Sequence, residues 1–207
     1  MAGTVPLAAS TVPHPRRPLD PVRHWYENDL GWATVPAPPG EPLRLVTGVR
    51  FDVLDMPAEA GAKALRHLLP GSPVALRGDR MRLLVAAGSA EELPGLLDWL
   101  EWRVPDLDLR ALGAGGRTEA PARPGRAEGT SRGEAQPAQG AAVWLRPPEP
   151  GREVEASLPT LSAVGGGGGA PDLVRLVDTV ATECHRIRLR RAGAGRGPGN
   201  RQALASS

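Results

Sequence analysis

Residues capable of metal or nucleophilic chemistry are few in this chain, and their spacing is poor for it. Cys184 is the only cysteine, which excludes an intrachain disulfide and a thiolate zinc cluster. His185 follows it directly, but neighbours on a helix point about 100° apart, so the pair does not form a thiol and its base. Asp52 and Asp55 are three positions apart on an expected strand and therefore face opposite sides, which is poor geometry for one metal. The histidines are scattered, at His14, His24, His67 and His185. We therefore expect no complete metal or nucleophile site, and no working enzyme.

A run of five glycines, Gly165 to Gly169, precedes an expected helix. Free N–H groups at a helix start can bind phosphate. The run lacks the Gly-Lys-Ser/Thr ending that contacts the β- and γ-phosphates and magnesium. Uninterrupted glycine is also too flexible for a preorganised cradle, so the run is interpreted as a linker.

Arginine supplies nearly all of the positive charge, because Lys63 is the only lysine among 25 basic residues. A formal net charge of +2 is too small to indicate nucleic-acid binding by itself. The distribution is more informative, since no acidic residue follows Glu183 while several arginines do. These arginines could contact phosphates, or could favour the C-terminal dipole of the last helix. The candidates are Arg186, Arg188, Arg190 and Arg191.

An early aromatic group consists of Trp25, Tyr26 and Trp32. Packing in the core is one interpretation. The other is an exposed anchor for a partner, because Trp and Tyr are enriched at binding hot spots.

The elements that must position these side chains alternate between strand and helix. Asp20-Pro21 predicts a helix start, with Asp20 as N-cap and a stop at Gly31. Ser89 and Glu92 have capping-box spacing before a leucine stripe. Expected helices begin at Pro21, Pro57, Ser89 and Pro171-Asp172, and expected strands cover 32–35, 43–46, 50–54, 73–77, 81–87, 107–111, 141–145 and 153–156. This pattern predicts an α+β fold, a mixed β-sheet flanked by helices.

The predicted domain organisation is one core interrupted by flexible segments. A disordered leader (1–18) precedes the α/β core (19–120), and a flexible insertion (121–140) rich in Pro, Gly and charge follows it. Late strands and a final helix (141–191) complete the core before a disordered tail (192–207). The chain has neither a signal-peptide pattern nor an apolar stretch long enough to span a membrane, so we expect a cytoplasmic protein without a membrane partner.

From about Trp25 to Pro121 the chain resembles the N-terminal domain of bacterial bifunctional DNA primase–polymerases. The matching pieces are Gly31-Trp32-Ala33-Thr34-Val35-Pro36, Val46-Thr47-Gly48, Phe51-Asp52-Val53-Leu54-Asp55, Arg77-Gly78-Asp79-Arg80-Met81, Asp108-Leu109-Arg110, Gly115-Gly116 and Ala120-Pro121. The resemblance implies an RRM-like core.

That family's chemistry needs an Asp-x-Asp pair, a histidine that contacts the nucleotide and a third acid, which together serve divalent metals. Here Asp55 matches the first acid and Asp108 the third, but Pro57 and Met81 occupy the other two positions. Neither proline nor methionine supplies the missing chemistry. The resemblance therefore implies a degenerate metal site in a noncatalytic domain.

Three functions follow from these observations. The leading expectation is a primase–polymerase-like domain that acts by binding, as a regulatory or accessory factor in DNA metabolism, with no cofactor. One alternative is an active primase or polymerase that depends on magnesium or manganese. The other is a protein-interaction module without a nucleic-acid role.

Overall fold

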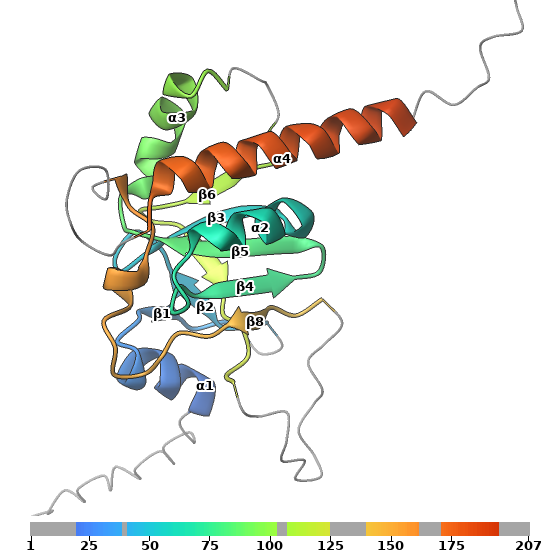
Figure 1. Ribbon diagram of the computed structural model, residues 1–207. Helices are drawn as coiled ribbons and strands as arrows, with labels where there is room; N and C mark the ends of the chain where they lie inside the picture. The colour runs from blue at the N-terminus through green and yellow to red at the C-terminus, as the bar shows by residue number, and fades with distance from the viewer. Residues whose placement is uncertain (1–19, 39–40, 103–106, 125–139, 162–170, 195–207) are drawn as a thin grey trace, which may run out of the picture.

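The main sheet is built by a β-α-β-β-α-β succession in the middle of the chain (Figure 1). The computed structural model describes residues 20–38, 41–102, 107–124, 140–161 and 171–194. The succession comprises β3 (Asp52–Pro57), α2 (Ala58–Ala64), β4 (Val74–Arg77), β5 (Arg80–Val85), α3 (Ser89–Trp99) and β6 (Arg110–Leu112). The strands lie in the order β6-β3-β5-β4, and β8 (Val143–Arg146) is added at the edge beside β4. All of these ladders are antiparallel, which is the split βαβ arrangement.

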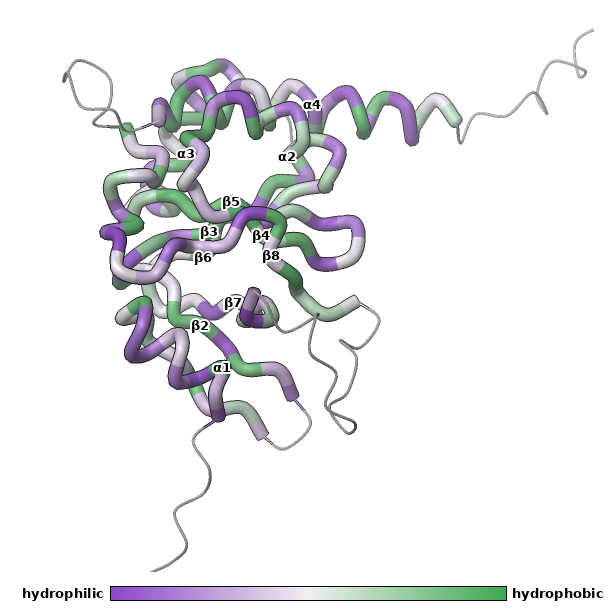
Figure 2. The backbone as a smooth tube through the Cα atoms, turned by 60° about the horizontal axis from the view of Figure 1, so that its bottom comes forward, coloured by the Kyte–Doolittle hydropathy of each residue, from purple (hydrophilic) through white to green (hydrophobic). Residues whose placement is uncertain are grey.

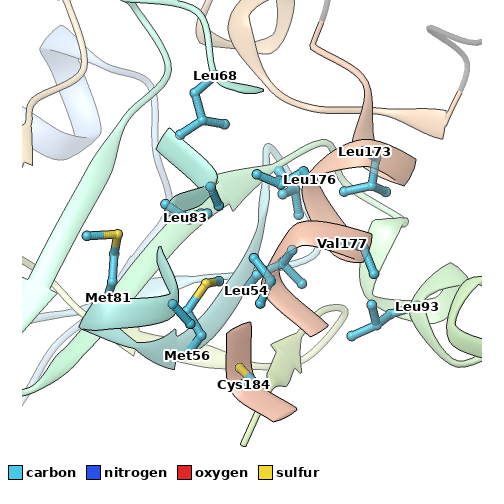
Figure 3. Packing of buried hydrophobic residues seen from close by; sticks show 14 of the residues in the cluster. Leu54, Met56, Leu68, Met81, Leu83, Leu93, Leu173, Leu176, Val177 and Cys184 are labelled. Atoms are coloured by element: carbon cyan, nitrogen blue, oxygen red, sulfur yellow. The ribbon is translucent and has the colours of Figure 1, made fainter. Parts of the chain in front are cut away.

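Helices cover one face of this sheet. The long helix α4 (Leu173–Ala194) packs with α2 and α3 over β3 and β5. A buried cluster fills this layer, and it includes Leu54, Met56, Met81, Leu83, Leu176 and Val177 (Figure 3). Gly61 permits the close approach of α2, because a Cβ there would lie 2.4 Å from the Met81 sulfur.

A smaller sheet lies on the side of the main sheet that is opposite to the helix layer (Figure 2). It consists of β1 (Thr34–Val35), β2 (Arg44–Val46) and β7 (Arg117–Glu119), all antiparallel. The first helical segment joins α1 (Pro21–His24) to a π-helical turn, η1 (Trp25–Asp29). A second buried cluster forms here, from Trp25, Tyr26, Leu30, Trp32, Leu45, Phe51, Val53, Leu84, Val154 and Leu158.

The two expected strands on either side of Thr47-Gly48 belong to different sheets, β2 to the smaller and β3 to the main one. Gly48 lies where the chain passes from the smaller sheet to the main one, and its backbone packs closely against the loop before β7. Its φ is +85°, and a Cβ at this position would lie 2.2 Å from the Ala114 Cα. Only glycine fits a positive φ at such a close backbone contact.

Several local expectations are confirmed. The Asp20 side chain accepts a hydrogen bond from the Val22 N–H, and Pro21 stands in the first turn of α1. The predicted hairpin around Gly78-Asp79 is formed by β4 and β5. The last helix begins after Asp172, whose Oδ1 accepts from the N–H groups of Val174 and Arg175.

Two local expectations are wrong. Ser89 is not the N-cap of α3, because Gly88 takes that place in a left-handed conformation and the helix start is capped from β3 by Asp52. The segment expected as a strand at 153–156 is instead a 3-10 helix, η3 (Val154–Ser157). A second 3-10 turn, η2 (Leu65–His67), follows α2.

The fold class is α+β, with two antiparallel sheets flanked by helices where one mixed sheet was expected. Helix α4 runs to Ala194, three residues beyond the boundary placed at 191. The leader 1–18, residues 125–139 of the insertion, the glycine run 165–169 and the tail from residue 195 lie outside the described residues. Across the described ranges, no helix combines the length and apolar character needed to span a membrane.

Candidate functional site

Asp55 and Asp108 come together in the fold, and a guanidinium lies between them. Arg80 donates from Nε to Asp55 Oδ1 at 2.6 Å and from Nη1 to Asp108 Oδ1. Arg82 donates from Nε to the other Asp55 oxygen, Oδ2, at 3.0 Å. Both oxygens of Asp55 are therefore engaged by arginine.

Strand register explains this meeting. In the β3–β5 ladder Asp55 pairs with Arg82, and Pro57 pairs with Arg80. On the other flank of β3, Asp55 pairs with Arg110 of β6. Directly paired residues place their side chains on the same face of a sheet. Asp55 consequently lies in a row of arginines on the face turned away from the helix layer. The second cluster covers this face at Val53 and Leu84, and we call only the part that carries Asp55, Arg80, Arg82 and Arg110 the open face.

The ion pairs are partly buried, which strengthens them relative to surface pairs. The side chains of Asp55, Arg82 and Arg80 are 14%, 13% and 22% exposed. Burial acts to lower the pKa of Arg80, but its hydrogen bonds to Asp108 and Asp55 outweigh that effect and raise it. Arg80 is thus held firmly in its charged form.

This donor set does not fit a divalent metal. A metal bound by Asp55 and Asp108 would have to displace a cation that is already hydrogen-bonded to both. Pro57, which shares the open face with Asp55, has no side-chain ligand to add. Within the described part of the chain, no group of three or more His, Cys, Asp or Glu residues is arranged to hold a metal ion.

Met81 lies on the opposite side of the sheet from Asp55. It pairs with Met56 in the β3–β5 ladder and packs in the cluster beneath the helices. A side chain at position 81 therefore faces α2, and Arg80 and Arg82 are the β5 residues that face the carboxylates.

Helix α4 reaches the same site through Asp108. Arg191 Nη1 lies 3.7 Å from Asp108 Oδ2, and the Cys184 thiol donates to the Asp108 carbonyl oxygen at 3.7 Å. Burial raises the pKa of Cys184 to about 11, so its thiol remains protonated at neutral pH. A protonated, buried thiol is a packing group and not a nucleophile.

The arginines at the end of α4 have partners within the chain. Arg186 pairs with Glu183, Arg190 with Glu59 of α2, and Arg191 with Asp108, and Arg188 also makes an interaction. Two of these pairs connect α4 to the body of the protein, so this segment has a structural role whether or not it contacts nucleic acid.

The early aromatic group does not form an exposed partner-binding surface. Trp25, Tyr26 and Trp32 are 3%, 0% and 2% exposed. Tyr26 donates to the Pro121 carbonyl oxygen at 2.7 Å and accepts from Trp144 Nε1 at 3.1 Å. These residues form the second core, because α1 and η1 fold over the smaller sheet.

Sequence reasoning missed Arg80 and Arg82 as members of the site, although the hairpin that carries them was predicted. Once Asp55 is paired with Arg82, the alternation along β5 also places Arg80 on the open face. The sequence does show the alternation of arginine with Met81 and Leu83 along β5. This alternation identifies Arg80 and Arg82 as neighbours of Asp55 only when the register with β3 is known.

Comparisons of the chain with protein-family models, with curated proteins and with solved structures gave no match.

Proposed function

We propose that this chain is a noncatalytic, primase–polymerase-like domain that acts by binding, as a regulatory or accessory factor in DNA metabolism. The observation that carries the proposal is the bridge from Arg80 to both Asp55 and Asp108. Carboxylates that are neutralised by a shared arginine are poor metal ligands. A metal ion bound to them would leave the partly buried arginine without its partners and next to a second positive charge. Binding without phosphoryl transfer is the function that these residues favour.

The topology supports the fold part of this proposal. The succession β-α-β-β-α-β, with its first strand between the third and the fourth, is the order expected for an RRM-like sheet. The central strands β3 and β5 carry Asp55, Arg80 and Arg82 on the open face.

The charge of the open face supports an anionic partner. Arg77 is 50% exposed and pairs with Glu119. Arg110 is exposed and lies opposite Asp55 in the ladder, but among the described residues it is not within ion-pair distance of an acidic group. Exposed arginines beside an already neutralised pair can contact phosphates, and each such contact adds a salt-dependent contribution to affinity.

Catalysis is tested by template-dependent DNA synthesis with magnesium or manganese, using the wild-type protein and Asp55→Asn. We expect no synthesis from either. Metal-dependent synthesis by the wild type that Asp55→Asn abolishes would overturn the noncatalytic part of the proposal.

Binding is tested by titrating single- and double-stranded DNA at several salt concentrations. We expect binding that weakens with salt, and a weaker and less salt-dependent interaction for Arg110→Ala. Arg152→Ala is the matched control, because Arg152 is 74% exposed and lies on a loop outside both sheets. No binding at low salt would remove nucleic acid as the partner and leave a protein-interaction module.

A further inference from the structure

The outer face of α3 is acidic and carries an exposed tryptophan. Leu93 and Leu96 turn inward, whereas Trp99 on the outer side is 72% exposed. Between Ser89 and Trp102 the sequence has four acidic residues and no basic one. We call this surface the acidic face; its members are Glu92, Asp98, Trp99 and Glu101, whereas Glu91 turns to the loop before β7 and accepts a hydrogen bond from the Ala114 N–H.

The C-terminal end of α4 has the opposite character. Cys184 and Ile187 turn inward, whereas Leu189 on the outer side is 57% exposed. Arg186 precedes Leu189 by three positions and Arg190 follows it directly, and their side chains are 65% and 61% exposed. We call this surface the basic end; its members are Arg186, Arg188, Leu189 and Arg190.

Within one molecule most of the basic end lies apart from the acidic face (Figure 1). The segment after α3 lies beside the middle of α4, because Trp102 Nε1 donates to Asp178 Oδ1 at 3.1 Å and the Trp102 ring lies 6.0 Å from the His185 ring. The basic end extends away from α3 beyond the sheet in both views (Figures 1 and 2). A second molecule can bring its acidic face to the outer side of the basic end, around Leu189.

Existing pairs at the basic end leave its charge available. Arg190 pairs with Glu59 at exposed positions, whereas Arg186 pairs within the helix with Glu183, whose side chain is 15% exposed. Exposed pairs contribute about 0–1 kcal/mol, so an arginine can exchange its partner at little cost. The segment 183–194 retains a strong positive balance, with four arginines against one glutamate.

We propose that the helix layer is the interface for a second copy of this chain. Two molecules pack antiparallel across their α3–α4 surfaces, so that each acidic face meets the basic end of the other. Both surfaces lie on the outer side of helices whose inner sides face the main sheet, and one two-fold axis therefore makes both contacts. Trp99 packs against the partner's Leu189, with charge complementarity around this apolar contact.

Analytical ultracentrifugation over a range of protein and salt concentrations tests the dimer. We expect a reversible dimer that dissociates as salt is raised. Trp99→Ala should weaken it by about tenfold, as for an aromatic anchor at an interface.

Charge reversal tests which surfaces meet. Glu92→Lys with Asp98→Lys reverses the acidic face, and Arg186→Glu with Arg190→Glu reverses the basic end. Each pair alone should abolish the dimer, and all four substitutions in one chain should restore it. The control is Glu149→Lys with Arg152→Glu, an exposed i,i+3 ion pair on a distant loop, which should leave the dimer unchanged.

Three results would overturn the proposal. They are a monomer at every concentration, a dimer that neither reversal affects, and a failure of the fourfold variant to dimerise while its circular dichroism matches the wild type. Growth into larger assemblies instead of a dimer would contradict the reciprocal geometry. None of these results depends on DNA binding or on catalysis, so they are separate from the tests of the proposed function.

Discussion

The carboxylate of Asp52 caps helix α3 from a neighbouring strand. Its Oδ2 accepts hydrogen bonds from the N–H groups of Gly88 and Ala90, each at 2.9 Å. Asp52 is fully buried, and its other oxygen has no hydrogen-bond partner in the described structure. An element of the main sheet thus supplies the helix cap that Ser89 and Glu92 were expected to form.

Asp52→Ala should destabilise the protein by about 1–3 kcal/mol, because two partly buried N–H donors lose their acceptor. Asp52→Asn keeps an acceptor and removes a buried charge, so it should remain within about 1 kcal/mol of the wild type at neutral pH. Denaturant unfolding of the three proteins measures both effects. Equal losses for the two variants would contradict the capping role.

The same residue predicts a pH dependence. Burial raises the pKa of Asp52 and outweighs the opposing hydrogen bonds from Ala90 and Gly88. The folded state therefore binds the proton more tightly than the unfolded chain. Relative to Asp52→Asn, the wild type should lose stability as pH rises from the unfolded pKa through the higher folded one. The free energy of unfolding of the wild type minus that of Asp52→Asn, measured at each pH, isolates this effect. A difference that rises with pH would contradict the prediction.

Arg80→Ala should cost about 2–3 kcal/mol, because it leaves Asp55 and Asp108 without the donor that bridges them. Arg23→Ala is the comparison, since the Arg23–Glu27 pair is exposed and its loss should cost less than about 1 kcal/mol. Chemical denaturation provides both values. If the two substitutions lower the free energy of unfolding equally, solvent screens the Arg80 network as fully as it screens a surface pair.

The single tyrosine provides a clean probe of the second core. Burial raises the pKa of Tyr26, with the hydrogen bond from Trp144 acting in the other direction. In an alkaline titration, phenolate absorbance should therefore appear only together with the loss of circular dichroism. Tyr26→Phe should cost about 1–3 kcal/mol, because the Pro121 carbonyl and the Trp144 N–H lose a buried partner. Ionisation of Tyr26 in the folded protein would show that the core is open to water.

Cys184 should react slowly with a thiol reagent under native conditions and quickly in denaturant. The residue is 2% exposed, and burial raises the pKa of its thiol to about 11. Colorimetric titration of the thiol against denaturant concentration checks this, and reaction should follow unfolding. Rapid reaction of the native protein would mean that α4 separates readily from β6.

Sequence reasoning succeeded where structure depends on near neighbours. Asp20-Pro21, Gly78-Asp79 and the leucines of α3 act through residues a few positions away, and they predicted a helix start, a hairpin and a buried helix face. Pairings between distant segments were beyond reach, as with β2 and β7 or β3 and β6. The cap of α3 depends on such a distant pair, because Asp52 and Ala90 are 38 positions apart.

The candidate site divides in the same way. The resemblance pointed to Asp55 and Asp108, which do lie together, but the cation that joins them depends on the register of β3 with β5. The exposed positions were harder still. Trp25 and Trp99 have the same chemistry in a sequence, and only the packing of α1 over the smaller sheet separates the buried one from the exposed one.

Strands β3 and β5 each contribute side chains to both hydrophobic clusters, Leu54 and Leu83 to one and Val53 and Leu84 to the other. The two cores are therefore tied to one pair of backbones, and neither can open fully without disturbing that pair. Amide protons of β3 and β5 should be the slowest in the molecule to exchange with solvent, at the rate set by global unfolding. A chain with two cores should thus melt in a single cooperative transition.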